Sequence, residues 1–142
     1  MTTPREATEA IEIGRSVRFS KTVGEFDVYQ FAGITGDFSP NHVDEEYMKG
    51  TPYGRRIAHG VLMVGYMSTA STKILEGIPY PCVSYGYDRI RFVKPVFIGD
   101  TITIEYRVAE KVPEKGQLLS QVTATNQHGE VVAAATHILK FV

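Results

Sequence analysis

The chain has 142 residues, of which 43% are hydrophobic and 22% charged, and its formal net charge is -1. This length suits one domain with its own core, so we expect a single domain over residues 1–142, and the composition excludes disordered and collagen-like chains. Lysine and arginine are scattered along the chain, which argues against a nucleic-acid partner.

Residues 1–13 mix Arg5 with three glutamates and contain no apolar run that could act as a signal peptide, and we expect this segment to be loosely ordered. The single cysteine, Cys82, cannot form an internal disulfide, which favours a reducing compartment; we expect a cytoplasmic protein. The longest uncharged stretch, residues 57–72, is shorter than the roughly 20 apolar residues that cross a membrane, so no membrane association is expected.

Apolar and polar residues alternate over residues 16–20, which predicts a short, half-buried strand. A helix is predicted next, with Thr22 and Glu25 as its capping box and its end near residues 33–36.

Pro40 predicts an ordered turn after this helix, because its backbone angle is fixed and it lacks an N–H. The acidic residues 44–46 predict the start of a short helix that stops at Gly50. From Gly60 the sequence is apolar nearly all round, which predicts a helix covered on most sides.

The second half of the chain predicts strands, at residues 82–93, 101–110, 118–126 and 131–141. The clearest alternation covers residues 101–108, where apolar residues take every second position. Tight turns at residues 99–100, 114–116 and 128–129 separate the strands, so neighbouring strands should pair antiparallel. The simplest way to bury both apolar surfaces is an α+β fold in which a curved antiparallel sheet wraps one long helix.

Composition does not explain residues 36–42, GDFSPNH, or the pair His59-Gly60 that opens the buried helix. The order Gly-Asp, Pro, His and a later His-Gly resembles the MaoC-like, or (R)-specific enoyl-CoA hydratase, family. The likeness runs from about Val17 to the C-terminus and includes residues 94–100, which are similar to the turn before a late strand in that family. The resemblance implies a hot-dog fold.

In that family an Asp and a His hold a water that adds to the double bond of a trans-2-enoyl thioester, giving a (R)-3-hydroxyacyl product, or the reverse. The resemblance therefore assigns Asp37 and His42 as the catalytic pair. The residue chemistry agrees, since hydration needs a base for the water proton and an acid for the α-carbon. On an uninterrupted helix these two side chains would point roughly 140° apart, and the turn at Pro40 removes that obstacle.

The family resemblance assigns Gly60 to the thioester carbonyl. A helix N-terminus offers free N–H groups to the negative charge that develops there, and a residue without Cβ lets the carbonyl come close. One such donor is worth about 3 kcal/mol of barrier. Ser68, two turns further along, sits where the family often has a serine. His59 is placed with the substrate-binding residues, with a structural role bonded to the main chain as the alternative.

Arg55 and Arg56 are candidates to meet the phosphates of coenzyme A, although such a pair is usually a solvated loop. The chain departs from the family pattern at Ser39 and Asn41, where an Asn and an aliphatic residue are usual. Ser39 can still make the local side-chain to backbone bonds that an Asn would make in such a turn. Asn41 is expected to alter the acyl pocket, so the substrate could be shorter or more polar than a simple fatty enoyl chain.

Other histidines and aromatics have plainer interpretations. His128 is expected to be a solvated turn residue and His137 a packed or edge residue, and Tyr85, Tyr87 and Phe92 are expected in the core of the sheet.

Two other functions stay open: a hot-dog acyl-CoA thioesterase, in which His42 would lack an obvious task, and a non-catalytic acyl-thioester binding module. We expect no metal and no cofactor, since coenzyme A would be part of the substrate. The resemblance implies a homodimer or higher homo-oligomer. An acyl-carrier-protein thioester is an alternative to coenzyme A.

Overall fold

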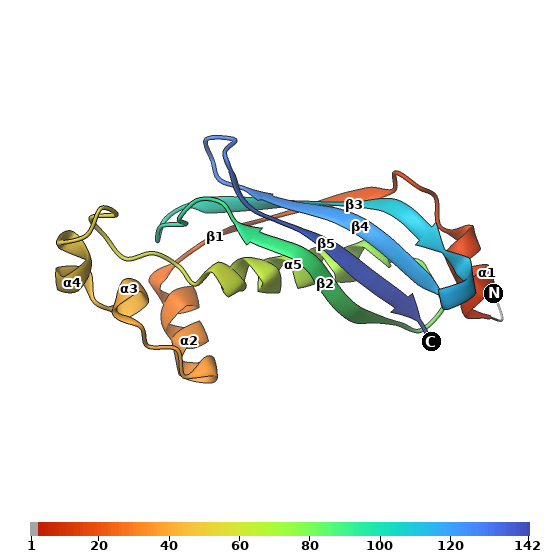
Figure 1. Ribbon diagram of the computed structural model, residues 1–142, viewed down its shortest axis with the longest axis horizontal. Coiled ribbons are helices and arrows are strands. Elements are labelled where there is room, and N and C mark those ends of the chain that lie inside the picture. The colour runs from red at the N-terminus through yellow and green to blue at the C-terminus, as the bar shows by residue number, and fades with distance from the viewer. Residues whose placement is uncertain (1–2) are drawn as a thin grey trace.

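Residues 3–142, which the computed structural model describes, form a five-stranded antiparallel sheet in the order β1-β3-β4-β5-β2. A long helix, α5 (Gly60–Ile74), runs along one face of this sheet (Figure 1). The strands are β1 (Ser16–Thr22), β2 (Cys82–Phe92), β3 (Thr101–Val112), β4 (Gln117–Thr125) and β5 (Val131–Phe141). The predicted α+β architecture, a helix against a curved antiparallel sheet, is confirmed.

The short helices lie at the two ends of the molecule. Three of them gather at the end that is distant from both termini (Figure 1). They are α2 (Glu25–Thr35), α3 (Pro40–Val43) and α4 (Glu45–Lys49). The predicted helix at residues 44–46 with its stop at Gly50 is confirmed, because Asp44 caps α4 by accepting the Tyr47 N–H at 2.9 Å and Gly50 is the C-cap.

The start of α2 differs from the prediction. Thr22 is the last residue of β1, and its hydroxyl pairs with that of Thr101 at 2.7 Å, so the Thr22–Glu25 capping box is wrong. The carboxylate of Asp27 instead accepts the N–H of Gly24 at 2.8 Å. Strand pairing thus takes Thr22 away from the helix.

The segment at residues 1–13 also differs, within the part that the structure describes; residues 1 and 2 lie outside it. Residues Pro4–Ala10 form helix α1, with Thr3 as its N-cap. Ala7 is fully buried and Ile11 is 3% exposed, both within the hydrophobic core. The apolar contacts of these two residues order a segment that local composition had suggested was loose.

Strand β3 shows the predicted alternation. Its apolar residues Ile102, Ile104, Tyr106 and Val108 are all fully buried. Helix α5 contacts β3 and contributes Met63, Met67 and Ala70 to the same core. The helix is less enclosed than predicted, because Val61, Gly65 and Ser68 form an exposed stripe along it.

The pairing of the strands is only partly as predicted. The turns at residues 113–116 and 126–130 do join antiparallel neighbours, β3 with β4 and β4 with β5. Strands β2 and β3 do not pair, because β1 and β4 occupy the two sides of β3; Ile104 faces Phe19 on one side and Ala124 on the other. Strand β2 instead pairs with β5 and forms an edge of the sheet.

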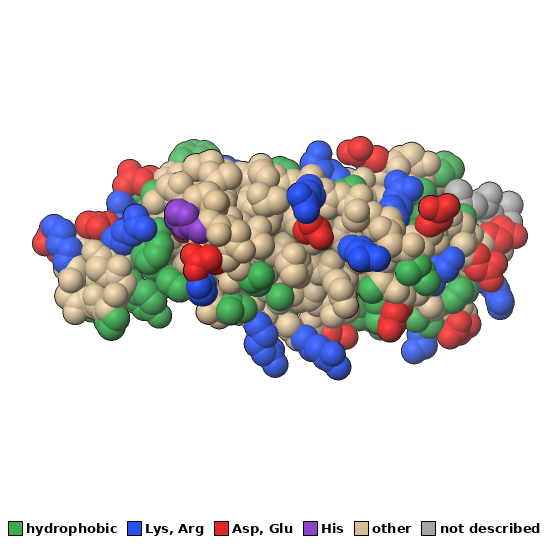
Figure 2. Space-filling view, turned by 90° about the horizontal axis from the view of Figure 1, so that it is seen from above, with side chains coloured by type: hydrophobic (Ala, Val, Ile, Leu, Met, Phe, Trp, Pro, Cys, Tyr) green, Lys and Arg blue, Asp and Glu red, His purple; other side chains and the backbone are tan. Residues whose placement is uncertain are grey.

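The aromatic stripe of β2 follows from this edge position. Tyr85 is 61% exposed and Phe92 50% exposed, so only Tyr87 packs against the core as expected. From above, the molecule shows basic and acidic side chains interspersed among neutral groups (Figure 2). Among residues 3–142, no helix combines the length and apolar character that a membrane crossing requires.

Candidate active site

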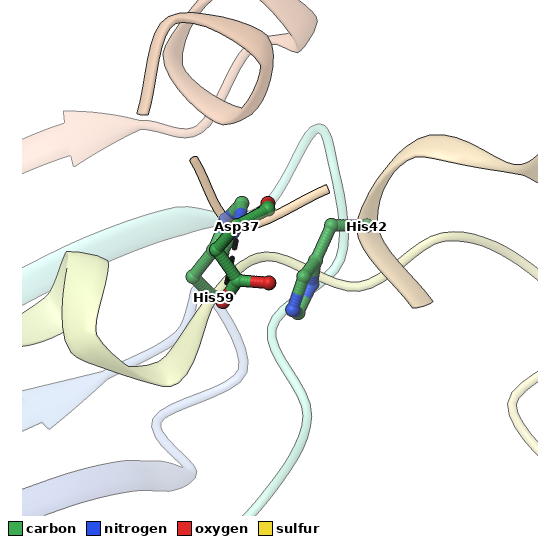
Figure 3. Close-up of side chains that lie close together, drawn as sticks. All are labelled: Asp37, His42 and His59. Atoms are coloured by element: carbon green, nitrogen blue, oxygen red, sulfur yellow. Dashed lines mark hydrogen bonds and ion pairs between the residues drawn. The ribbon is translucent and has the colours of Figure 1, made fainter. Parts of the chain in front are cut away.

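Three side chains from separate segments meet where α2, α3 and α5 approach one another. Gly36 ends α2 in a left-handed conformation, with φ 81°, and so redirects the chain at Asp37. His42 lies in α3, and His59 directly precedes α5. One carboxylate oxygen of Asp37 and one ring nitrogen from each histidine lie within 4.8 Å of one another (Figure 3).

The orientation of His42 is fixed by the main chain. Its Nδ1 lies 2.7 Å from the carbonyl oxygen of Ile57. A carbonyl oxygen only accepts, so Nδ1 carries the proton and a neutral His42 keeps its lone pair on Nε2. The Ile57 N–H donates to the Asn41 carbonyl at 2.9 Å, which ties the segment before α5 to α3.

Asp37 is the more open member of the group, since its side chain is 50% exposed. Its Oδ1 accepts the main-chain N–H of Ser39 at 3.3 Å, so the bond in this turn uses the side chain of Asp37 and not, as predicted, that of Ser39. Its Oδ2 lies 4.0 Å from Nε2 of His59, and that same nitrogen lies 3.0 Å from the Asp37 carbonyl oxygen. Among residues 3–142, the Asp37 carboxylate therefore forms no close ion pair.

A cleft of about 250 Å³ opens beside this group. His42 and Gly60 both line it, together with the apolar side chains of Met63, Phe92 and Val132. Asp37 is not part of its lining, and its carboxylate reaches the site through its proximity to His42. A mostly apolar cleft with few polar groups is the usual form of a small-molecule site.

Gly60 is the first residue of α5, and among residues 3–142 its N–H finds no acceptor, as expected in the first turn of a helix. The positive end of the helix dipole lies at the same point. A Cβ on Gly60 would fall 2.8 Å from Cγ of Phe92, which is closer than carbon atoms approach. The glycine therefore serves close packing as well as leaving its N–H accessible.

Several residues that the sequence assigned to the substrate lie elsewhere. Ser68 is on the exposed stripe of α5 and does not line the cleft. The side chain of Asn41 is exposed at the surface of α3, although its carbonyl is used by Ile57. His59 is 1% exposed and also does not line the cleft, which agrees with the alternative structural role.

Arg55 and Arg56 have different surroundings. Arg56 is 15% exposed and donates to Glu25 at 2.5 Å and to Glu45 at 2.6 Å, and these bonds raise the pKa of its guanidinium. Arg55 is exposed, with its guanidinium 3.9 Å from the centre of the Phe97 ring. Arg56 is therefore committed to α2 and α4, while Arg55 is available to an anion.

Arg55 borders a second cavity of about 200 Å³ that shares Lys94 and Pro95 with the main cleft. Lys94 also pairs with Glu130 at this surface. Residues 94–97 therefore lie between the main cleft and the cavity that Arg55 borders.

The residues that sequence reasoning missed are those of the cleft wall. Phe92 was expected in the sheet core, and nothing singled out Met63 or Val132. Each of these residues belongs to an ordinary apolar pattern, so the sequence does not distinguish them from core residues. Identifying them requires knowing which strand ends lie near α5.

The three side chains are poorly arranged for a metal. The rings of His42 and His59 stack with centroids 3.7 Å apart and planes inclined by 25°, whereas a shared ion must lie in both ring planes. One nitrogen of each ring is already bonded to a carbonyl oxygen, Nδ1 of His42 to Ile57 and Nε2 of His59 to Asp37. The arrangement suits proton transfer between a carboxylate, an imidazole and a bound water.

Comparisons with known proteins find relatives of this chain by sequence and by fold. A (R)-specific enoyl-CoA hydratase of Rhodospirillum rubrum is 39% identical over 117 residues, covering 82% of this chain and 79% of the relative. An R-hydratase of Pseudomonas aeruginosa superimposes with a TM-score of 0.82 at 30% identity, covering 94% of this chain and 84% of that one. A (R)-hydratase of A. caviae involved in PHA biosynthesis gives a TM-score of 0.85 at 28% identity, covering 94% and 99%.

These relatives establish the hot-dog fold. Residues 7–132 match the family described as the MaoC like domain. This chain belongs to the MaoC-like domain family.

Proposed function

We propose that this protein adds water to the double bond of a trans-2-enoyl-CoA to give the (R)-3-hydroxyacyl-CoA, and catalyses the reverse dehydration. Relatives named (R)-specific enoyl-CoA hydratase and 3-hydroxybutyryl-CoA dehydratase support a hydro-lyase. The observation that carries the proposal is that His42 and Gly60 face one apolar cleft while Asp37 lies within 4.8 Å of His42.

In the proposed reaction Asp37 and His42 hold the water between them. The water oxygen forms a bond to C3 of the enoyl group as one of its protons passes to the pair, and the pair delivers a proton to C2. The pair therefore ends with the proton count with which it began. The lone pair on Nε2 of His42 suits it to accept the water proton, since its Nδ1–H is held by Ile57.

Gly60 supports the same step. Negative charge builds on the thioester oxygen as C3 is attacked, and the unpaired N–H at the start of α5 is a suitable donor for it. The proposed reaction needs no cofactor besides the coenzyme A of the substrate. Arg55, which is exposed beside the cavity next to the cleft, is the proposed contact for its phosphates.

The proposal includes a homodimer, formed through strand β2. This strand is an edge of the sheet, and it exposes Val83, Tyr85 and Phe92. Residues 82–87 of this edge carry no charged side chain and form a surface that a second strand can cover, whereas Asp88, Arg89 and Arg91 charge the rest of β2. The other edge, β1, carries Arg18 and Lys21, which disfavour strand addition. The free thiol of Cys82 supports a cytoplasmic location.

The test uses crotonyl-CoA, with the enoyl absorbance and free thiol followed together. Hydration removes the enoyl absorbance without releasing thiol, whereas thiol release with an intact enoyl group would show a thioesterase. Asp37→Asn and His42→Ala should each lower kcat by about 100-fold or more, the usual contribution of general acid–base catalysis. Glu46→Gln, at an exposed acid in the nearby α4, is the matched control and should keep wild-type kcat.

A further inference from the structure

We propose that His59 is a positioning residue, which holds Asp37 through its ring N–H and His42 through its ring face and does not contact the substrate. The inference rests on the proposed function of Asp37 and His42. It concerns a side chain that is 1% exposed and absent from the lining of the cleft.

The first contact ties Asp37 to the body of the protein. Nε2 of His59 lies 3.0 Å from the Asp37 carbonyl oxygen, which can only accept, so this nitrogen carries the proton. The other hydrogen bonds of Asp37 join it to Thr35 and Ser39, both two residues away along the chain. Those local bonds shape the turn, and among residues 3–142 it is the bond to His59 that joins Asp37 to the residue preceding α5.

The second contact holds His42. The His59 ring stacks on that of His42 with 3.7 Å between centroids (Figure 3). The centroid of the His59 ring also lies 4.7 Å from that of Phe31 in α2. His42 is thereby held by its Nδ1 bond to Ile57 at one edge and by a flat ring against its face. These two constraints define where Nε2 of His42 points.

His59 is chemically suited to a role that does not change during turnover. Its Nδ1 is buried and has no hydrogen-bond partner among the described residues. Its Nε2–H already donates to the Asp37 carbonyl oxygen, so the proposed positioning role requires no change in this bond during turnover.

Sequence position adds a third consequence. His59 directly precedes Gly60, so the bond to Asp37 joins the proposed acid–base pair to the start of α5. A displacement of about 1 Å in such a site can lower the rate of the chemical step by about 100-fold. Loss of His59 should therefore affect kcat and leave substrate binding largely intact.

Two variants separate the contacts. His59→Gln keeps an N–H donor for Asp37 but loses the ring, and His59→Phe keeps a ring against His42 but loses the donor. With crotonyl-CoA we expect each to lower kcat by about 10-fold and His59→Ala by about 100-fold, with KM changed by less than about threefold. The ¹⁵N signals of the His42 ring should shift in His59→Ala, reporting the loss of its fixed orientation.

His137→Gln is the matched control, because His137 is also fully buried and hydrogen-bonded but lies within the sheet. It should lower Tm without changing kcat. A rise in KM at unchanged kcat in the His59 variants would make His59 a substrate contact and overturn the proposal, as would wild-type kcat in His59→Ala. If His137→Gln and a His59 variant have the same decrease in Tm and the same decrease in kcat, the effect of His59 on kcat is an effect on folding and the positioning role is contradicted.

The outcome for Asp37 and His42 is read separately. If Asp37→Asn and His42→Ala keep full hydration, the proposed function of the pair fails whatever the His59 variants do. If those two variants are inactive while the His59 variants keep wild-type kcat, the positioning role alone fails.

Discussion

The ring of Phe92 packs against Gly60 at the place where any other residue would carry its Cβ, 2.8 Å from Cγ of the ring. The same two residues line the cleft. Gly60 therefore serves both close packing against Phe92 and access to its own N–H at the start of α5, and an experiment can separate these two roles.

We expect Gly60→Ala to destabilise the fold by about 1–3 kcal/mol, the usual cost of overpacking, and to lower hydration of crotonyl-CoA. In a Phe92→Ala background the added methyl group has room, so the loss of stability should disappear. If the thioester must approach the main chain here, kcat should still fall on going from Phe92→Ala to the double variant. Recovery of both properties in the double variant would show that Gly60 serves packing alone.

The two neighbouring arginines should behave differently. Arg56→Met removes the partner of Glu25 and Glu45 and should destabilise the protein by about 1–3 kcal/mol in urea unfolding, with KM for crotonyl-CoA unchanged. Arg55→Gln should raise KM several-fold, more at low than at high salt, with little change in stability. A larger rise in KM for Arg56→Met than for Arg55→Gln would reverse these assignments.

The buried His137 predicts a pH dependence of stability. Burial lowers its pKa to about 4, from an unfolded value of about 6.5. Between these values the unfolded chain binds a proton that the folded chain does not, so stability is complete above pH 6.5 and falls as the pH drops towards 4. The full loss is about 3 kcal/mol.

His137→Gln should show less of this loss, because it removes the titrating ring while keeping a side chain that can pair with Ser84 and Tyr106. The measurement is the free energy of urea unfolding at pH 7 and pH 4 for the variant and the wild type. His128→Gln, at an exposed turn, should follow the wild type. Parallel curves for wild type and His137→Gln would contradict the proposed origin.

Local patterns predicted much of the fold. The alternation in β3, the acidic start of α4 and the opening of α5 at Gly60 are each written in a few consecutive residues. Consecutive residues did not predict which strand pairs with β2, nor that residues 4–10 form an ordered helix, α1. Both features depend on which distant surfaces are left uncovered once the other elements have packed.

The candidate site also contains some residues that the sequence predicted and some contacts that it did not. Asp37, His42 and Gly60 could be selected from the sequence because their order resembles a family motif; the structure places Asp37 near His42, and His42 and Gly60 on one cleft. The contact between His59 and Asp37 joins residues that no helical or strand period relates. The commitment of Arg56 to Glu25 and Glu45 likewise depends on how α2 and α4 are arranged.

The edge strand β2 gives the last prediction. If two copies join through β2, the paired change Val83→Lys and Tyr85→Lys places charges on two of its exposed apolar side chains and should convert a dimer into a monomer. Light scattering coupled to size exclusion measures the change.

Val142→Lys is the control for added charge, since Val142 is 55% exposed but lies beyond β5. It should leave the dimer intact. A wild-type protein that is monomeric at assay concentration would contradict the dimer itself, whereas a dimer that survives the β2 changes would move its interface to another surface. The exposed stripe of α5 that contains Gly65 and Ser68 would then be the next candidate, because its small side chains permit close approach of a second helix.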